Sequence, residues 1–154
     1  LQQWQRPLES GAPSTPNASD YRPKQPLTRL WQVQDVEHNL SKPSHQLVDA
    51  RSTERFRGEQ EPIDPVSGHI PSAICLPSTD NLAPSGLFKT PEDLRERFAD
   101  ISSTNTVCYC GSGVTATHNI LAIRLAGMAE PVLYADSWSG WITDSDRPIA
   151  TENT

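Results

Sequence analysis

Short apolar segments alternate with longer amphipathic segments along most of the chain, and this alternation predicts strands that are each followed by a helix. Four apolar runs predict strands at residues 30–33, 46–49, 106–109 and 131–134, and residues 70–74 lead into a fifth. This order of elements favours an α/β domain with a mostly parallel sheet.

The predicted helices carry start and stop signals. Asp35 is placed to cap a helical turn, and Ser52 begins a short helix that Gly58 ends. Pro91 stands at the first-turn position of the next helix, where its missing amide proton removes no hydrogen bond. A further short helix is expected at residues 138–141.

The most regular helical pattern runs roughly from Thr115 to Ala126, with Gly127 as its expected C-cap. Its apolar residues are expected to pack into the core, and they are Ile120, Leu121, Ile123 and Leu125.

Composition divides the 154 residues into three parts. Residues 1–28 hold five of the fourteen prolines and are interpreted as a Pro-rich interdomain linker. Residues 29–150 form the expected domain, and residues 151–154 form a tail. The chain starts with Leu1 rather than Met, so we expect a piece of a longer protein or a processed product.

Charge and cysteine content narrow the functional class. A net charge of −6 and a pI of about 5.1 give no reason to expect a nucleic-acid or anionic-membrane partner. No apolar stretch approaches the roughly 18 residues of a membrane span. Three cysteines do not make a disulfide framework, so a reducing, cytoplasmic setting is expected.

Cys110 is the strongest candidate for chemistry because it ends a predicted strand and opens a loop of small residues before a helix. Gly111 and Gly113 tolerate positive φ and let the backbone turn its amides inward, and Ser112 and Thr115 add hydroxyl donors. Converging donors and a helix N-terminus favour a thiolate and can hold an anionic sulfur or phosphorus group beside it.

Other interpretations of this cysteine are weaker. A buried structural thiol is the role expected of Cys75 and Cys108, and alternate strand residues such as Cys108 and Cys110 do not present disulfide geometry. The four histidines show no ligand-like spacing to the cysteines, so no metal is expected. Cysteine phosphatases place an arginine six residues after the nucleophile, where this chain has Ala116.

Four regions of the chain resemble the rhodanese superfamily, and more narrowly the C-terminal catalytic domain of tandem thiosulfate/3-mercaptopyruvate sulfurtransferases. They are Val48-Asp-Ala-Arg51 with Glu54-Arg-Phe56, Ser67-Gly-His-Ile-Pro-Ser-Ala73, Cys110-Gly-Ser-Gly-Val-Thr-Ala116 and Tyr134-Ala-Asp-Ser-Trp-Ser-Gly-Trp141. The resemblance implies a rhodanese-like three-layer fold with a parallel five-stranded sheet flanked by helices.

The resemblance also implies a ping-pong reaction without metal or organic cofactor. Cys110 would take a sulfane sulfur from thiosulfate or 3-mercaptopyruvate, carry it as a persulfide, and pass it to a thiophilic acceptor, cyanide or a thiol. An alternative of another class is a sulfur-carrier or interaction module that a protein partner loads.

Residue roles follow from the same resemblance. Ser112 would help to deprotonate or stabilise the attacking sulfur. The substrate-binding residues would be Arg55 and the loop residues Gly111, Gly113, Val114, Thr115 and Ala116.

The residues that resemble the family do not all point to the same sulfur donor. Neutral Gly111 and Ser112 resemble the mercaptopyruvate group, in which two arginines hold the substrate carboxylate. Arg55 matches the first of these arginines, but Ile63 stands at the place of the second. Arg51 or Arg57 is the candidate replacement for the missing arginine.

Residues 1–11 resemble the segment that leaves a first domain in tandem members of the family. The resemblance therefore implies an N-terminal rhodanese-like domain in the same protein, which would supply one wall of the active site. The chain without that domain is expected to accept sulfur poorly.

Overall fold

The computed structural model describes residues 11–12, 22, 24 and 28–152, and the described strands build one parallel sheet. The sheet order is β1-β5-β4-β2-β3, so β4 lies at its centre. The strands are β1 (Leu30–Trp31), β2 (Gln46–Asp49), β3 (Ile74–Cys75), β4 (Thr106–Tyr109) and β5 (Val132–Tyr134). The predicted linker at 1–28 lies almost wholly outside the described residues.

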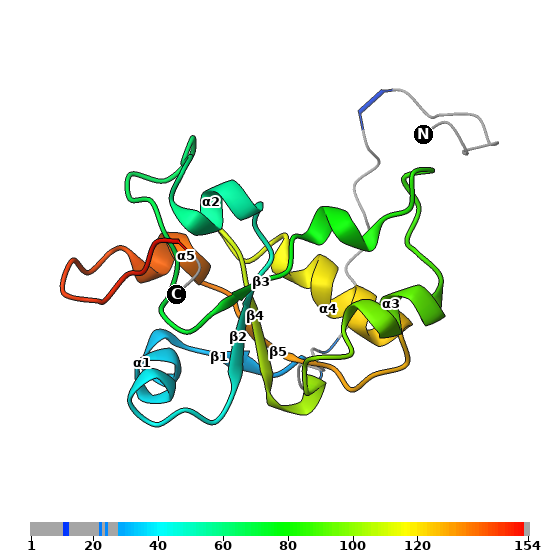
Figure 1. The fold of residues 1–154 in the computed structure, drawn as a ribbon, viewed down its shortest axis with the longest axis horizontal. Helices are drawn as coiled ribbons and strands as arrows, with labels where there is room; N and C mark the ends of the chain where they lie inside the picture. Colours follow the sequence, from blue (N-terminus) through cyan, green and yellow to red (C-terminus); the bar gives the residue numbers. More distant parts are fainter. Residues whose placement is uncertain (1–10, 13–21, 23, 25–27, 153–154) are drawn as a thin grey trace.

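Helices cover both faces of this sheet, which confirms the predicted three-layer α/β architecture (Figure 1). Helices α3 and α4 lie on one face, and α1, α2 and α5 lie on the other. The helices are α1 (Val33–Ser41), α2 (Thr53–Arg57), α3 (Pro91–Arg97), α4 (Ala116–Leu125) and α5 (Ser137–Trp141). Two short 3₁₀ turns, Ser78–Asn81 and Ser103–Asn105, were not predicted.

The central strands bury side chains on both faces, because successive strand residues point in opposite directions. Leu47 and Val107 pack into the core under α1, α2 and α5, while Val48 and Cys108 pack against α3 and α4. Double burial explains why the middle residues of each strand, Leu47-Val48 in β2 and Val107-Cys108 in β4, are apolar in succession rather than alternating with polar residues.

Helix α2 begins and ends at the predicted residues, and α3 begins at its predicted residue. The Ser52 hydroxyl accepts from the Arg55 amide at 3.5 Å, and Gly58 ends α2 with φ +77°. Pro91 is in the first turn of α3, and Thr90 before it is the N-cap. Local sequence signals were sufficient here because each cap is made within one helical turn.

The first helix begins earlier than predicted, which shortens β1 to two residues. Asp35 is not the cap but the third helical residue, and its carboxylate accepts from the amide of the true N-cap, Gln32, at 2.8 Å. An Asp is favourable at either position because the helix N-terminus stabilises negative charge. Charge alone therefore did not distinguish the two placements.

The prediction for α4 was partly wrong. Ile120 and Ile123 are buried as expected, but Leu121 and Leu125 are 48% and 43% exposed. Residues 116, 119, 120, 122, 123 and 126 form the buried face, and at 100° per residue positions 121 and 125 turn away from it. The C-cap is Ala126, and Gly127 follows it with φ +74°.

Within the part of the chain that the structure describes, the longest helix has 10 residues, and none has the length and apolar character to cross a membrane.

Candidate active site

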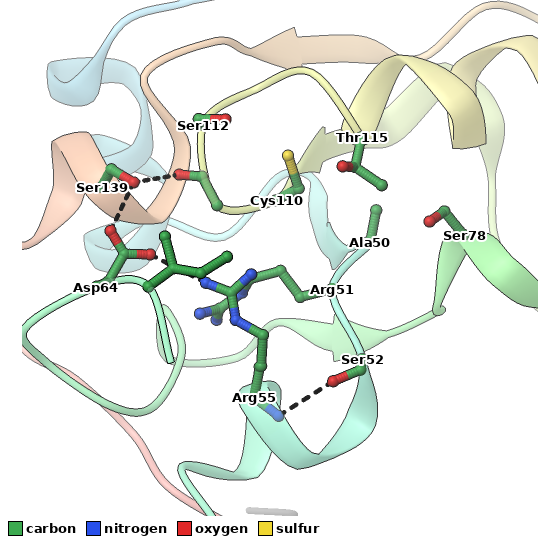
Figure 2. A pocket seen from close by; sticks show the side chains of 12 residues that line it. Ala50, Arg51, Ser52, Arg55, Asp64, Ser78, Cys110, Ser112, Thr115 and Ser139 are labelled. Atoms are coloured by element: carbon green, nitrogen blue, oxygen red, sulfur yellow. Dashed lines mark hydrogen bonds and ion pairs between the residues drawn. The ribbon is translucent and has the colours of Figure 1, made fainter. Parts of the chain in front are cut away.

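A cavity of about 270 Å³ opens at the carboxyl end of the sheet, directly beyond the central strand (Figure 2). Parallel α/β sheets bind ligands at this edge, and Cys110 is the first residue after β4. The lining comes from the α2 region, the following loop, the 3₁₀ turn Ser78–Asn81, the Cys110 loop and α5. It consists of Ala50, Arg51, Ser52, Arg55, Ile63, Asp64, Ser78, Cys110, Gly111, Ser112, Thr115 and Ser139.

The start of α5 holds the main chain of Cys110 in place. The Cys110 amide donates to the Ser137 hydroxyl oxygen at 3.1 Å, and the Cys110 carbonyl accepts from the Trp138 amide at 3.0 Å. Cys110 is only 1% exposed, and its sulfur points into the loop between Ser112 and Thr115 (Figure 2). The thiol therefore sits in a fixed position at the base of the cavity.

The loop between β4 and α4 keeps its backbone donors open. Among the described residues, the amides of residues 111–116 donate to no protein acceptor. Helix α4 begins at Ala116, the last of these residues, and the helix N-terminus adds a partial positive charge. Such a strand-to-helix loop can stabilise an anionic sulfur or an anionic ligand.

The two loop glycines differ in how far the structure requires them. Gly113 has φ +81°, and a β-carbon there would clash with the carbonyl oxygen of Ala135. Gly111 does not adopt the expected positive φ. A β-carbon on Gly111 would lie 3.5 Å from Nη2 of Arg55, which is an ordinary contact distance, so the guanidinium lies beside the main chain next to Cys110 without requiring a glycine there.

Only some of the predicted site residues line the cavity. Gly111, Ser112 and Thr115 do so together with Cys110 and Arg55. Gly113 is buried, and Val114 is 74% exposed. Ala116, the first residue of α4, is buried in the core. None of these three residues lines the cavity.

Arg55 lines the cavity but is already paired with protein carboxylates. Its Nη2 lies 2.7 Å from Glu61 Oε1 and 3.0 Å from Asp64 Oδ2, and its Nε donates to both Glu61 oxygens at 3.1 Å. A substrate carboxylate would therefore share this guanidinium with two resident anions.

Neither alternative arginine is free to replace the missing one. Arg51 is buried, donates to both Asp49 oxygens and to the Gly68 carbonyl, and lies 3.3 Å from Glu61. Burial alone would lower the pKa of Arg51, but hydrogen bonding and attraction to Asp49 outweigh it and raise this pKa. Arg57 does not line the cavity.

Asp64 and Ser139 are site residues that sequence reasoning missed. The Ser139 hydroxyl lies 2.8 Å from both Asp64 Oδ1 and the Gly111 carbonyl oxygen, and thus links the loop after α2 to the Cys110 loop (Figure 2). Ser139, like Ser137, lies inside the segment 134–141 that resembles the family. Asp64 carries no recognised sequence pattern, since its partners Arg55 and Ser139 lie 9 and 75 residues away.

The other two cysteines have the properties of structural thiols. Burial raises the pKa of Cys108 to about 12, and burial followed by the nearby Asp49 carboxylate raises the pKa of Cys75 to about 11. Neither residue lines the cavity.

A family model for the rhodanese-like domain matches residues 32–144. Among curated proteins, the chain is 48% identical over 136 residues to a Pseudomonas aeruginosa protein named "Probable 3-mercaptopyruvate sulfurtransferase". It is 39% identical over 149 residues to human 3-mercaptopyruvate sulfurtransferase. These alignments cover 86% and 92% of this chain but only 48% and 50% of the relatives, so the chain spans about half of their length.

Among solved structures, the chain resembles the Tum1 protein from Saccharomyces cerevisiae with a TM-score of 0.69 and 27% sequence identity. That likeness covers 82% of this chain and 47% of the yeast chain.

Proposed function

This chain belongs to the family of rhodanese-like domains, and from that membership we propose that it is a sulfurtransferase that works through a persulfide on Cys110. One observation carries the proposal: the Cys110 sulfur faces a cavity within a loop whose amides 111–116 are open to a ligand. A persulfide is anionic near neutral pH, and open backbone donors stabilise such a charge without a neighbouring base.

The proposed reaction has two half-steps. The Cys110 thiolate attacks the sulfane sulfur of thiosulfate, the S–S bond breaks, and sulfite leaves with the bonding electrons. With 3-mercaptopyruvate the C–S bond breaks instead, and the carbanion that leaves takes up a proton to become pyruvate. A thiolate or cyanide then attacks the outer persulfide sulfur and regenerates the Cys110 thiolate. Ser112 and Thr115 line the cavity, and their hydroxyl groups donate hydrogen bonds to the sulfur atom that is transferred.

Two features of the setting belong to the same proposal. A reducing compartment such as the cytoplasm keeps Cys110 as a thiol between turnovers. Because the chain spans about half of the relatives, we also propose that an N-terminal rhodanese-like domain completes the site in the whole protein.

Intact-mass spectrometry of the 154-residue chain tests the chemistry. After incubation with thiosulfate or 3-mercaptopyruvate, we expect a gain of one sulfur atom that cyanide removes. The Cys110→Ser variant should gain nothing, while Cys108→Ser, a matched change in the same segment, should still gain sulfur. The absence of any gain with both donors would refute the small-molecule sulfurtransferase activity for this chain.

A protein-loaded sulfur carrier is the second candidate, favoured by exposed apolar side chains near the site. Ile63, which lines the cavity, is 75% exposed, and Val114 in the Cys110 loop is 74% exposed. A carrier would gain sulfur from a persulfidated protein but not from thiosulfate or 3-mercaptopyruvate. Parallel incubations with the three donors, read by intact mass, distinguish the two functions.

A further inference from the structure

The ion pairs beside Cys110 carry more negative than positive charge. Arg51 and Arg55 are surrounded by three carboxylates, those of Asp49, Glu61 and Asp64. With every member ionised, this cluster has one net negative charge. Among the described lining residues no other side chain is basic, so no lining cation lacks a carboxylate partner.

The contacts of Glu61 favour its charged state. Burial alone would raise the pKa of Glu61, but hydrogen bonds from Arg55 and from the amides of Asp64 and Ile63 outweigh it, and the pKa is lowered. The cluster also lies close to the main chain next to Cys110. A β-carbon built on Gly111 would be 3.5 Å from Arg55 Nη2 and 3.9 Å from Asp64 Oδ2.

Asp64 is the carboxylate of this cluster that lines the cavity. Glu61 does not line it and instead accepts from the amides of Ile63 and Asp64 at 3.1 Å. Asp64 Oδ2 accepts from Nη2 of Arg55 at 3.0 Å, while Glu61 accepts from both Nε and Nη2. A donor anion that binds Arg55 in the cavity therefore lies next to the carboxylate of Asp64.

We propose that Asp64 is a specificity-determining residue that makes this site select sulfur donors with a single negative charge over dianionic donors. The proposal rests on the proposed sulfurtransferase function and deepens it. The physical reason is electrostatic: a thiolate that attacks a dianion brings three negative charges together, and the guanidinium that would offset them is already paired.

A matched pair of donors isolates the effect of charge. Thiosulfate and methanethiosulfonate both present a terminal sulfane sulfur, but the first carries two negative charges and the second one. In both reactions the Cys110 thiolate forms a bond to that sulfur and the S–S bond breaks. The leaving group is sulfite from thiosulfate and methanesulfinate from methanethiosulfonate, so both reactions are balanced without an added oxidant or reductant.

The experiment measures the rate of Cys110 persulfide formation by intact mass for both donors, in the 154-residue chain and three variants. Asp64→Asn should raise the rate with thiosulfate relative to methanethiosulfonate about tenfold, because one negative charge in the cavity lining is removed. Asp64→Glu keeps the charge and should keep the donor ratio. Asp144→Asn, which removes an equal charge outside this cavity, should also leave the ratio unchanged.

Ionic strength gives a readout that needs no variant. When the salt concentration rises from about 0.01 M to 0.5 M, the rate of persulfide formation in the unaltered chain should increase more with thiosulfate than with methanethiosulfonate. The reason is that salt screens the repulsion between the site and the more highly charged donor. An unchanged donor ratio in Asp64→Asn, or equal salt slopes for the two donors, would overturn the role of Asp64 while leaving sulfur transfer intact. No persulfide with either donor in the unaltered chain would overturn the proposed function and this inference together.

Discussion

The Cys110 amide donates to the Ser137 hydroxyl oxygen at 3.1 Å, and the same hydroxyl donates to the Tyr134 carbonyl at 2.9 Å. One buried side chain thus connects the candidate nucleophile at the end of β4 to the turn between β5 and α5. Ser137 also has φ +54°, a conformation that a residue with a β-carbon adopts at a cost. The position of the thiol therefore depends on a serine 27 residues further along the chain.

We expect Ser137→Ala to lower the free energy of unfolding by about 1–3 kcal/mol, because it leaves a buried amide and a buried carbonyl without a partner. Ser137→Gly loses the same hydrogen bonds but relieves the positive φ, and should be more stable than Ser137→Ala by about 1 kcal/mol. Urea unfolding of the three proteins checks the order. A Ser137→Gly variant more stable than the unaltered chain would contradict the importance of the hydroxyl.

Gly113→Ala is expected to distort the Cys110 loop, because the new β-carbon clashes with the Ala135 carbonyl oxygen as well as straining φ. Persulfide formation, measured by intact mass, should fall at least about tenfold, since a displacement near 1 Å at a reacting centre has an effect of this size or larger.

Gly86 provides the control for that substitution. It has a similar φ of +77°, but a β-carbon there would have no atom within 4 Å. Gly86→Ala should therefore lower stability by about 1–2 kcal/mol without changing the rate of persulfide formation. Equal losses of rate in the two variants would show that the clash with Ala135 is irrelevant.

Acid should destabilise the chain through His69. The ring is fully buried and stacked on Phe56, its Nδ1–H donates to the Phe56 carbonyl at 2.7 Å, and its Nε2 has no partner among the described residues. Burial lowers the pKa of His69 below 6.5. The unfolded chain therefore binds more protons than the folded chain just below pH 6.5, and stability should fall as the pH drops through that range.

Urea unfolding at several pH values between 7 and about 5 measures this slope. His69→Gln should reduce the slope, whatever its effect on stability at pH 7, because one titrating group is removed. His118, whose pKa burial also lowers, contributes in the same direction, so His118→Gln is measured in parallel. A slope that His69→Gln leaves unchanged would show that His69 is not the group responsible.

Cys75 and Cys108 should resist alkylation in the folded protein. With a pKa of about 11 for Cys75, only about one thousandth of the thiol is ionised at pH 8, and the thiolate is the reactive form. Cys108, with a pKa of about 12 and no exposed surface, should react still more slowly.

The Cys110→Ser variant isolates these two thiols. Iodoacetamide at pH 8 should leave it unlabelled by intact mass under native conditions and label it twice in denaturant. Rapid double labelling of the native variant would contradict the raised pKa of Cys75 and the burial of Cys108.

The sequence by itself determined those features that depend on neighbours along the chain. The apolar runs of β2 and β4, the Ser52 and Gly58 caps of α2, and the thiol at the end of β4 were predicted from local patterns and are present in the structure. They were predictable because burial on both faces of a strand, a helix cap and a strand-to-helix turn each leave a short-range pattern in the residues.

Tertiary structure alone decided which groups meet around that thiol. The Ser139 link to Gly111 and the Ser137 support of Cys110 join segments that are far apart in the sequence. The pairing of Arg55 with Glu61 and Asp64 spans only 6 and 9 residues, but it depends on the path of the loop after α2. Arg55 was predicted to bind the substrate, and the structure shows its guanidinium paired with two protein carboxylates. The reason is physical: the charge available to a ligand depends on which partners lie within about 4 Å, and distance in space does not follow from distance in sequence.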